Sequence, residues 1–398
     1  MNRTAAVLLA GLLLAALPAH AEEPIRVTVG GAFEGYMAGS DQMDGPGQPG
    51  FGRRGYAIYR RARIDFGGDT ALDDGVKVGF RIILRGNDHR RDQIDQSWVY
   101  LENPFGRFEM GRVRSAAYQM HYAMPGIQTA SDPWLINRPA GDFTGFVIPT
   151  ATLARRSSSF VDSPKSARVV YYTPRIAGVQ VGLSYAPDGC LPPPNDYDSP
   201  TQNGPTVSQN CPGTIATAFQ GSNDLGQQGD RISAGINYLT KIGTVELALS
   251  AGYLAARVEN SGAGRFRNQQ AWNVGGQLRY AGFILGGAFK TDNHGTVRAA
   301  TTPVPGRETD WNIGLVRTDG RWRYGVGYAA LQVEALDTTG AGAGHDRYDA
   351  VEIGGSYELG PGISLTAGTE YERWKSRNGN PLGTNRGWAW QAGVITRF

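Results

Sequence analysis

The feature of this sequence that most constrains its fold is an alternation of apolar and polar residues, which recurs in short segments up to the last residue. In TVELALSAGYL, Val245, Leu247 and Tyr253 fall on one side of an extended chain, and Glu246 and Ser250 fall on the other. A period of two is typical of a β-strand with two different faces. We expect sixteen such strands, over residues 25–37, 54–67, 75–85, 94–102, 106–113, 166–173, 178–186, 231–240, 243–256, 270–281, 282–291, 309–318, 321–333, 347–359, 361–374 and 386–398.

The connections between these segments alternate between short and long. Short ones such as Asp319-Gly320 and Gly360–Gly362 carry good turn residues. Antiparallel hairpins place all short turns at one end of a sheet and all long loops at the other. An even number of strands of about ten residues with this asymmetry is typical of an outer-membrane barrel. The long connections span about 41–53, 86–93, 114–165, 187–230, 257–269, 292–308, 334–346 and 375–385.

The two faces of the strands favour a transmembrane barrel over a soluble β-sandwich, the main alternative. Tryptophan and tyrosine concentrate at the ends of the apolar face, as with Trp272 and Tyr280, where a membrane interface would hold them. The other face carries charged and amide residues on strand after strand, such as Gln277, Arg279 and Arg323. These are too many for a dry core. We therefore expect an all-β, antiparallel barrel with apolar side chains towards lipid and polar ones towards a water-filled lumen.

The last segment, GWAWQAGVITRF, should close this barrel. In hydrocarbon every backbone N–H and C=O needs a partner, so a membrane sheet must have no free edge. We expect this segment to pair with the first strand, IRVTVGGAFEGYM, with its tryptophans towards lipid and Gln391 and Arg397 towards water. The sequence also holds 56 glycines, which indicates close backbone approaches within the β structure.

Residues 1–21, MNRTAAVLLAGLLLAALPAHA, have the pattern of a secretory signal peptide, which leaves residues 22–398 as the barrel. The apolar run is too short for the alternative, a transmembrane anchor, and no later run is long enough for a membrane helix. Cys190 and Cys211 bracket a loop rich in proline and asparagine. Because an oxidising compartment follows export, we expect them to form a disulfide, with two free thiols as the alternative.

Three segments carry a resemblance to a known family. NPFGRFEMGR (Asn103–Arg112) resembles the strand before the constriction loop of the general Gram-negative outer-membrane porins. ARVVYYTPRIAGVQVGLSYAP (Ala167–Pro187) is similar to the hairpin that follows that loop, and RARIDFGGDTALDDGVKVGFRI (Arg61–Ile82) to the second and third strands. The resemblance implies a sixteen-stranded homotrimer in the outer membrane, in contact with lipid and lipopolysaccharide. It also implies that Phe398 is the signal read by the outer-membrane assembly machinery.

The resemblance further implies a pore constriction, formed by a loop of about residues 114–165 folded into the lumen. In the family, loop carboxylates face a ladder of wall arginines, and by the resemblance Arg63 occupies one of these wall positions. The parity of a strand, the alternation of its side chains between two faces, turns Arg61, Arg63, Lys77, Arg81 and Arg85 inward. Asp95 stands where the family often has another arginine. The same alternation also turns several acids inward: Asp65, Glu246, Glu352, Glu370 and Glu372. Whether the pore prefers anions or cations therefore stays open. The expected constriction residues are Arg61, Arg63, Lys77, Arg81, Arg85, Asp132, Asp142 and Arg168.

These features predict passive diffusion of small hydrophilic solutes and ions through the barrel, with no enzyme activity. A sugar- or phosphate-selective channel is the nearest alternative, and an outer-membrane barrel hydrolase is a more distant one. Hydrolysis needs a base, most often histidine. We expect His89, His121, His294 and His345 to be exposed in loops, without partners. No pattern indicates a metal or another cofactor, and the net charge of +3 is too small to indicate nucleic acid as a partner.

Overall fold

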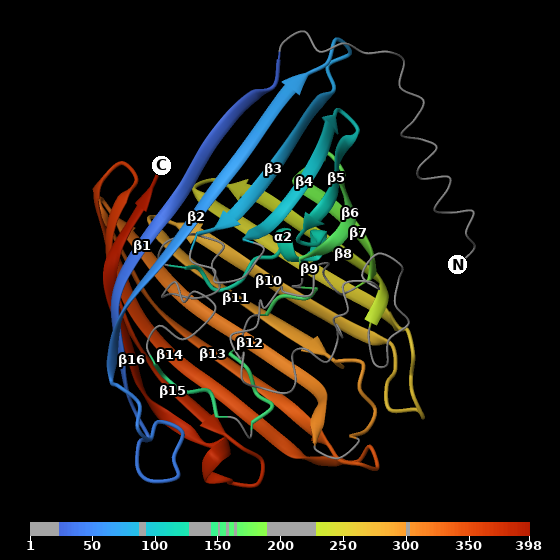
Figure 1. Cartoon of the computed structure of the whole chain (residues 1–398). Helices are drawn as coiled ribbons and strands as arrows, with labels where there is room; N and C mark the ends of the chain where they lie inside the picture. The colour runs from blue at the N-terminus through green and yellow to red at the C-terminus, as the bar shows by residue number, and fades with distance from the viewer. Residues whose placement is uncertain are drawn as a thin grey trace.

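The strands form one closed antiparallel barrel in which each strand pairs with its neighbours in sequence and β1 pairs with β16 (Figure 1). The computed structural model describes residues 24–86, 93–126, 145–149, 152–156, 159–162, 165–188, 228–299 and 303–398. Within them the strands are β1 (Arg26–Gln42), β2 (Tyr56–Ala71), β3 (Lys77–Arg85), β4 (Ile94–Asn103), β5 (Gly106–Val113), β6 (Ser166–Tyr172), β7 (Val179–Asp188), β8 (Gln228–Ile242), β9 (Val245–Val258), β10 (Gln269–Tyr280), β11 (Phe283–Asp292), β12 (Val304–Asp319), β13 (Trp322–Leu336), β14 (Gly342–Gly360), β15 (Ile363–Lys375) and β16 (Asn385–Arg397).

All sixteen expected segments are strands, and the expected fold class is confirmed. The differences lie at the ends with long loops. β1 continues to Gln42, and β14 begins at Gly342, so the loop expected over 334–346 shrinks to 337–341. Two bulges, at Glu334/Leu336 and Pro305/Glu308, break the register near this end. Beyond the hydrocarbon both faces of a strand meet water, so side-chain alternation no longer marks the strand there.

The hairpins alternate between tight turns at one end and longer connections at the other, as the sequence predicts. In the β10–β11 hairpin, Ala281 and Gly282 both have a positive φ, of 48° and 82°. A two-residue turn of this type matches the right-handed twist of the flanking strands. Gly282 fits this backbone without strain, whereas Ala281 is a rare non-glycine residue in the left-handed region.

Aromatic side chains on the outer face form two belts, over β8–β16. Rings from neighbouring strands contact one another in pairs, with Trp272 5.4 Å from Phe289 near the loop end and Trp322 4.7 Å from Tyr357 near the turn end. Aliphatic side chains such as Ile313, half exposed in the isolated chain, lie between the belts. This is the surface that two membrane interfaces and a hydrocarbon layer select.

The closing strand behaves as its sequence predicts. Gly393 of β16 lies opposite Tyr36 of β1, and the pairing extends to the terminal residue, whose N–H and carbonyl both bond to Gly31. Trp388 points outward with half of its surface exposed, while Gln391 points inward. The barrel therefore has no free edge.

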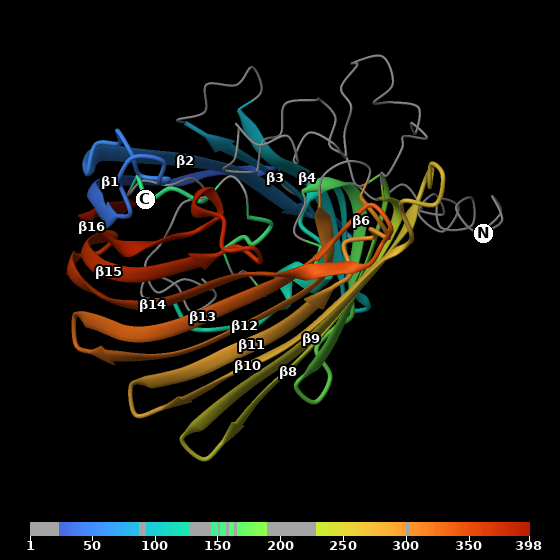
Figure 2. The same ribbon diagram turned by 90° about the horizontal axis from the view of Figure 1, so that it is seen from below.

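The described helical segments are short: α2 (Ala116–Gln119) and the 3-10 turn η2 (Pro381–Gly383). Within the part of the chain that the structure describes, no helix has the length and the apolar run that a membrane span would need. Seen along the barrel, the strands form a ring, and parts of the connection between β5 and β6 lie inside it (Figure 2). We call the described parts of residues 114–165 the inner loop.

Candidate functional site

The inner loop first crosses the inner wall from β6 towards β13. Ser115 caps α2, which packs against β6–β9. The N–H of Tyr122 then donates to Ser250 Oγ at 2.9 Å, and that of Met124 donates to Asn312 Oδ1 at 3.0 Å. Gly275 makes this close approach possible, because a Cβ there would lie 1.9 Å from the Tyr122 carbonyl oxygen. A glycine at this position of the wall is thus required for the loop to lie flat against it.

The loop returns along the inner wall from β16 and β1. Gln42 donates to the Gly145 carbonyl at 2.8 Å and accepts from the N–H of Val147 at 2.8 Å. The ring of Phe146 is fully buried in a cluster that includes Trp374. Further along, Arg156 makes two hydrogen bonds of 3.1 Å to the carboxylate of Glu372. Apolar packing and a buried bidentate ion pair together attach this pass of the loop to β13–β16.

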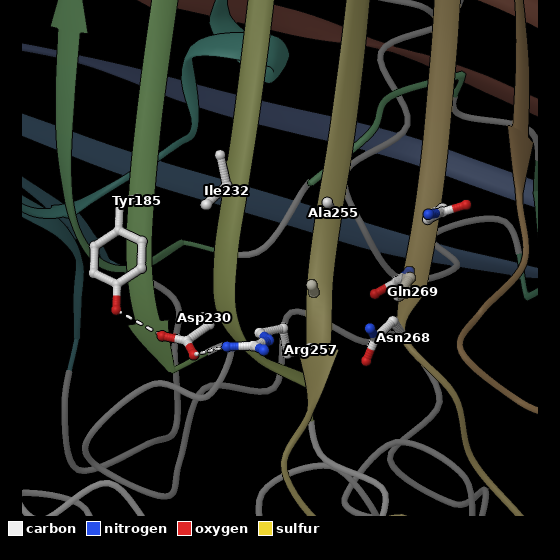
Figure 3. A pocket seen from close by; sticks show the side chains of 9 residues that line it. Tyr185, Asp230, Ile232, Ala255, Arg257, Asn268 and Gln269 are labelled. Atoms are coloured by element: carbon white, nitrogen blue, oxygen red, sulfur yellow. Dashed lines mark hydrogen bonds and ion pairs between the residues drawn. The ribbon is translucent and has the colours of Figure 1, made fainter. Parts of the chain in front are cut away.

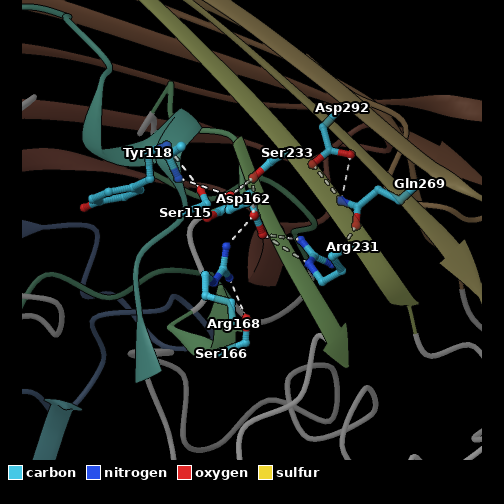
Figure 4. Close-up of polar contacts among 11 residues, drawn as sticks. Ser115, Tyr118, Asp162, Ser166, Arg168, Arg231, Ser233, Gln269 and Asp292 are labelled. Carbon is cyan, nitrogen blue, oxygen red and sulfur yellow. Dashed lines mark hydrogen bonds and ion pairs between the residues drawn. The ribbon is translucent and has the colours of Figure 1, made fainter. Parts of the chain in front are cut away.

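A buried carboxylate, Asp162, attaches the exit of the loop to the wall (Figure 4). Its Oδ2 accepts from Arg168 at 2.6 Å and from Ser233 at 2.9 Å, and its Oδ1 accepts from Arg231 at 3.0 Å. Ser115, at the entry of the loop, donates to the Asp162 carbonyl at 3.1 Å. Burial acts to raise the pKa of Asp162, but Arg231 and Arg168 together hold it well below its usual range. The ionised carboxylate therefore links the exit of the loop to β6 and β8, and the backbone carbonyl of the same residue links it to the entry.

His121 joins the two passes of the loop and is not the exposed residue that the sequence predicts. Its side chain is 7% exposed, with Nδ1 3.1 Å from Asn273 Nδ2 and Nε2 3.0 Å from Ser159 Oγ. Asn273 also donates to the Ser159 carbonyl at 2.8 Å, which fixes its amide nitrogen on this side. Nδ1 of His121 therefore accepts, and Nε2 carries the proton and donates to the serine. In this tautomer His121 cannot serve as a base for Ser159, which is itself fully buried.

We expect acid to weaken this contact. Burial lowers the pKa of His121 to about 3, so the neutral ring is favoured in the closed loop. Above the ordinary histidine pKa of about 6.5, the closed loop has the full stability that the neutral ring gives it. This stability falls as the pH drops from 6.5 towards 3, and at pH 5 it is about 2 kcal/mol lower than above pH 6.5. Hydrogen exchange of the Tyr122 and Ser159 amides, corrected for intrinsic rates, should be about thirtyfold faster at pH 5 than at pH 8. In a His121→Gln variant, most of this pH difference should disappear; an equal difference in both proteins would contradict the assignment.

The wall formed by β2 and β3 carries the basic residues that strand parity places inward. Each of four has a carboxylate partner: Arg61 with Glu34, Arg63 with Asp65, Lys77 with Asp69 and Arg85 with Asp95, over 3.9, 2.9, 2.6 and 2.8 Å. Arg63 lies directly opposite Arg85, and these acids offset the crowding of like charge. Arg81 lies opposite Gly67 and Trp98 and has no ion pair with a carboxylate in the described ranges.

The other predicted site residues divide into three groups. Arg168 points inward but lies beneath the loop, 3% exposed, where it binds Asp162 rather than lining open space. His294 lies in the turn after β11, as expected, but it is bonded to Glu308 at 3.1 Å, so the expectation that it has no partner is wrong. His345 lies within β14, so the expectation that it lies in a loop is wrong. The remainder lie outside the described residues: residues 1–21, His89, Asp132, Asp142, Cys190 and Cys211.

A separate groove lies on the outer face near the loop ends of β7–β10, with a volume of about 140 Å³ (Figure 3). Tyr185 donates to Asp230 at 2.8 Å at its rim, and Arg257 lies 3.8 Å from the same carboxylate. Ile232 and Ala255 supply its apolar surface. Because these side chains point away from the lumen, the groove is not part of a path through the barrel.

A closed sixteen-stranded barrel with a polar interior and a loop attached along its inner wall defines the porin class of β-barrels. The sequence profile of the Gram-negative porins matches residues 4–378, and the chain belongs to that family. Family and fold indicate an outer-membrane channel rather than an enzyme.

The chain is also similar to solved structures and to other proteins. The chain is similar to the anion-selective porin from Comamonas acidovorans, with a TM-score of 0.60 and 14% identity over 94% of this chain and 100% of that one. It is also similar to OmpT, an outer membrane protein of Vibrio cholerae, in its trimer form, with a TM-score of 0.56 and 12% identity over 94% and 100% of the two chains. An uncharacterized protein of Rickettsia felis is 22% identical over 353 residues, which are 78% of this chain and 77% of that protein. The two structural likenesses support the fold alone.

Proposed function

We propose that the protein forms a water-filled channel through which small hydrophilic solutes and ions diffuse passively across the outer membrane. The observation that carries this proposal is the position of the inner loop. Its described parts lie against β6–β16, contact β1 through Gln42 and reach Asp95 of β4 through Lys165. The Arg63 and Lys77 side chains on β2 and β3 are 44% and 47% exposed. Charged residues around an aqueous pore set the preference among small solutes.

Reconstitution into a planar lipid bilayer tests this function. Purified, folded protein should give stepwise increases in current in 1 M KCl, whereas buffer with detergent alone should give none. Folding is checked separately from the β-sheet circular dichroism of the same preparation. A folded preparation that repeatedly gave no current above the bare bilayer would exclude the channel.

We further propose that residues 127–144 provide the acidic side of a constriction, with Asp132 and Asp142 facing the arginines of β2 and β3. The family resemblance supports this assignment, as do the two attachment points that flank the segment. Arg323 of β13 donates to the Gly126 carbonyl at 2.7 Å, and Gln42 of β1 binds Gly145. Opposed acids and bases would produce a transverse field that orders water and slows apolar solutes.

The outer surface of β1–β4 supports a homotrimer. It lacks the aromatic belts of β8–β16 and presents exposed Val29, Phe33 and Met37 around Gly35 of β1. Of the other outward-facing glycines of β1, Gly31 lies under the Phe398 ring and Gly39 under the Trp390 ring. A surface without interfacial tryptophan suits contact with protein better than contact with lipid headgroups. Gly35 would allow a partner strand to approach closely.

Leucine at Gly35 should dissociate this trimer. A Cβ at Gly35 would meet only the ring edge of Phe33, at 3.7 Å, so the barrel itself has room for the side chain. The matched control is Gly355→Leu on the outer face of β14, where a Cβ has ordinary contacts from 3.4 Å. Light scattering in detergent should give monomers for Gly35→Leu and trimers for the control. Trimers in both variants would place the interface elsewhere.

Phe398 as the assembly signal also remains our proposal. Its ring is 72% exposed at the end of β16, and only its backbone is used in pairing with β1. The side chain is thus free for recognition by the assembly machinery. The matching family and the barrel fold support export to the outer membrane, for which residues 1–21 are the proposed signal peptide.

A further inference from the structure

The inner loop does not cover the inward-facing charges evenly. Carboxylates on the wall of β12–β15 lie under it: Leu153 donates its N–H to Asp346 at 2.6 Å, and Ser159 donates to Asp310 at 3.0 Å. These side chains face inward, as strand parity predicts. They do not reach open water, however, because the loop covers them. Each of the following carboxylates is at most 4% exposed: Glu308, Asp310, Asp346, Glu352, Glu370 and Glu372.

The cations of β2 and β3 stay in contact with the lumen. The side chains of Arg61, Arg63 and Arg85 are 39%, 44% and 32% exposed. Their partner carboxylates are less exposed, at 9%, 24% and 10% for Glu34, Asp65 and Asp95. In each of these three pairs the positive group is the one more exposed to solvent. Glu102 and Glu246 also face inward and are 48% and 51% exposed, but each pairs with a cation, Arg107 or Lys241.

β10 and β13 lie across the ring from β2 and β3 (Figure 2). Each carries an arginine near its turn end, Arg279 on β10 and Arg323 on β13. Arg279 donates to Gln277 at 3.3 Å, and Arg323 donates to the Gly126 carbonyl at 3.1 and 2.7 Å. Both contacts use neutral acceptors, and neither arginine forms an ion pair with a carboxylate in the described ranges. Arg279 also lies opposite Glu246, which pairs with Lys241 over 3.7 Å. Among the described residues, arginines without an ion pair thus lie on both sides of the interior, with Arg81 on one side and Arg279 and Arg323 on the other.

We propose that the pore prefers small anions, such as chloride and short carboxylates, over small cations. This inference rests on the proposed channel function and adds its substrate class. Solutes in the lumen interact with exposed charges much more strongly than with charges buried behind the loop, several of which also pair with Lys290, Arg377 or Arg156. The attraction extends over about one Debye length, about 10 Å at 0.1 M salt, so the preference should weaken as salt rises.

Ion replacement in single-channel recordings tests the preference. In a tenfold KCl gradient at low salt, the reversal potential should have the sign of chloride permeation, with chloride at least several-fold more permeant than potassium. Replacing potassium by lithium should change the conductance little, while replacing chloride by acetate should lower it in proportion to anion mobility. With the tenfold ratio kept, the reversal potential should move towards zero as the salt concentration in both chambers is raised.

The outcomes separate this inference from the function on which it depends. Absence of current would remove the channel itself. A current carried mainly by potassium, or one equally sensitive to lithium and acetate, would leave a channel but overturn the anion preference. As a check on the cause, Arg81→Gln should lower the chloride preference, whereas Arg317→Gln, which points outward over the Phe283 ring, should not.

Discussion

Replacing Asp162 with alanine should detach the exit of the inner loop while the barrel stays closed. The change leaves the guanidinium groups of Arg168 and Arg231, 3% and 7% exposed, without their shared carboxylate. Removing one partner of a buried ion pair typically costs about 3–5 kcal/mol. The sixteen-strand ladder does not depend on this contact, so we expect larger and noisier conductance from a folded barrel.

The matched control is Asp349→Ala. Asp349 also pairs with an arginine, Arg373, over 3.0 Å, but this pair lies on the outer face with its arginine side chain 60% exposed. Exposed pairs contribute about 0–1 kcal/mol. Limited proteolysis should therefore cut the inner loop of Asp162→Ala and spare that of the control. Equal protection in both variants, with unchanged conductance, would show that Asp162 does not hold the loop.

Reversing two charges on the β2–β3 wall, with Arg63→Glu and Arg81→Glu together, should turn the channel towards cations. The change shifts the charge of the exposed wall by four units, and in the family resemblance Arg63 takes the place of a wall arginine. Coulomb interaction with ions a few ångströms away makes this the largest effect on selectivity that we expect from two residues. The reversal potential in a KCl gradient should change sign.

Arg317→Glu provides the control for this double variant, because Arg317 lies on the outer face and points over Phe283. It reverses one charge of the same barrel without altering the lumen. An unchanged reversal potential in Arg63→Glu/Arg81→Glu would reject the assignment of this wall to the ion path. A shift of equal size in Arg317→Glu would show that overall charge, not the lumen, sets selectivity.

The strands could be predicted from the sequence because each one separates two solvents. Where lipid lies on one side and water on the other, side chains must alternate, as from Leu247 to Tyr253. The prediction failed at the loop ends for the same reason. From Gly342 to Asp346 no lipid selects the outer face, so the start of β14 carries no period of two. The backbone ladder continues there without a signal in the side chains.

The functional interior could be predicted only in part. The alternation of side chains was sufficient to predict that Arg61 and Arg81 face inward, because the face to which a side chain points is set within a single strand. Whether an inward charge meets water depends on which wall the inner loop covers, and that requires contacts between distant residues. Glu372 is buried because Arg156 lies on it, more than two hundred positions away in sequence. The burial of His121 likewise depends on Asn273 of β10.

Asp162 and Arg231 were missed for a related reason. Parity places Arg231 on the inner face of β8, but only the return of the loop brings a carboxylate to it. Asp162 precedes Arg168 by six positions, in a segment with no strand pattern of its own. An acid near the end of a long loop, followed by an inward arginine on the next strand, is the signal that could have identified this pair.

Water access to two neighbouring residues of β3 tests the central claim most directly. Arg81 is exposed and points into the lumen, while Ile82, opposite Phe66, points outward. In a background with Cys190→Ser and Cys211→Ser, Arg81→Cys and Ile82→Cys are exposed to a small anionic methanethiosulfonate reagent in a planar bilayer. We predict a stepwise fall in current for Arg81→Cys and no change for Ile82→Cys. Modification at position 82 but not at position 81 would contradict a barrel with its apolar face in lipid and its charged face around water.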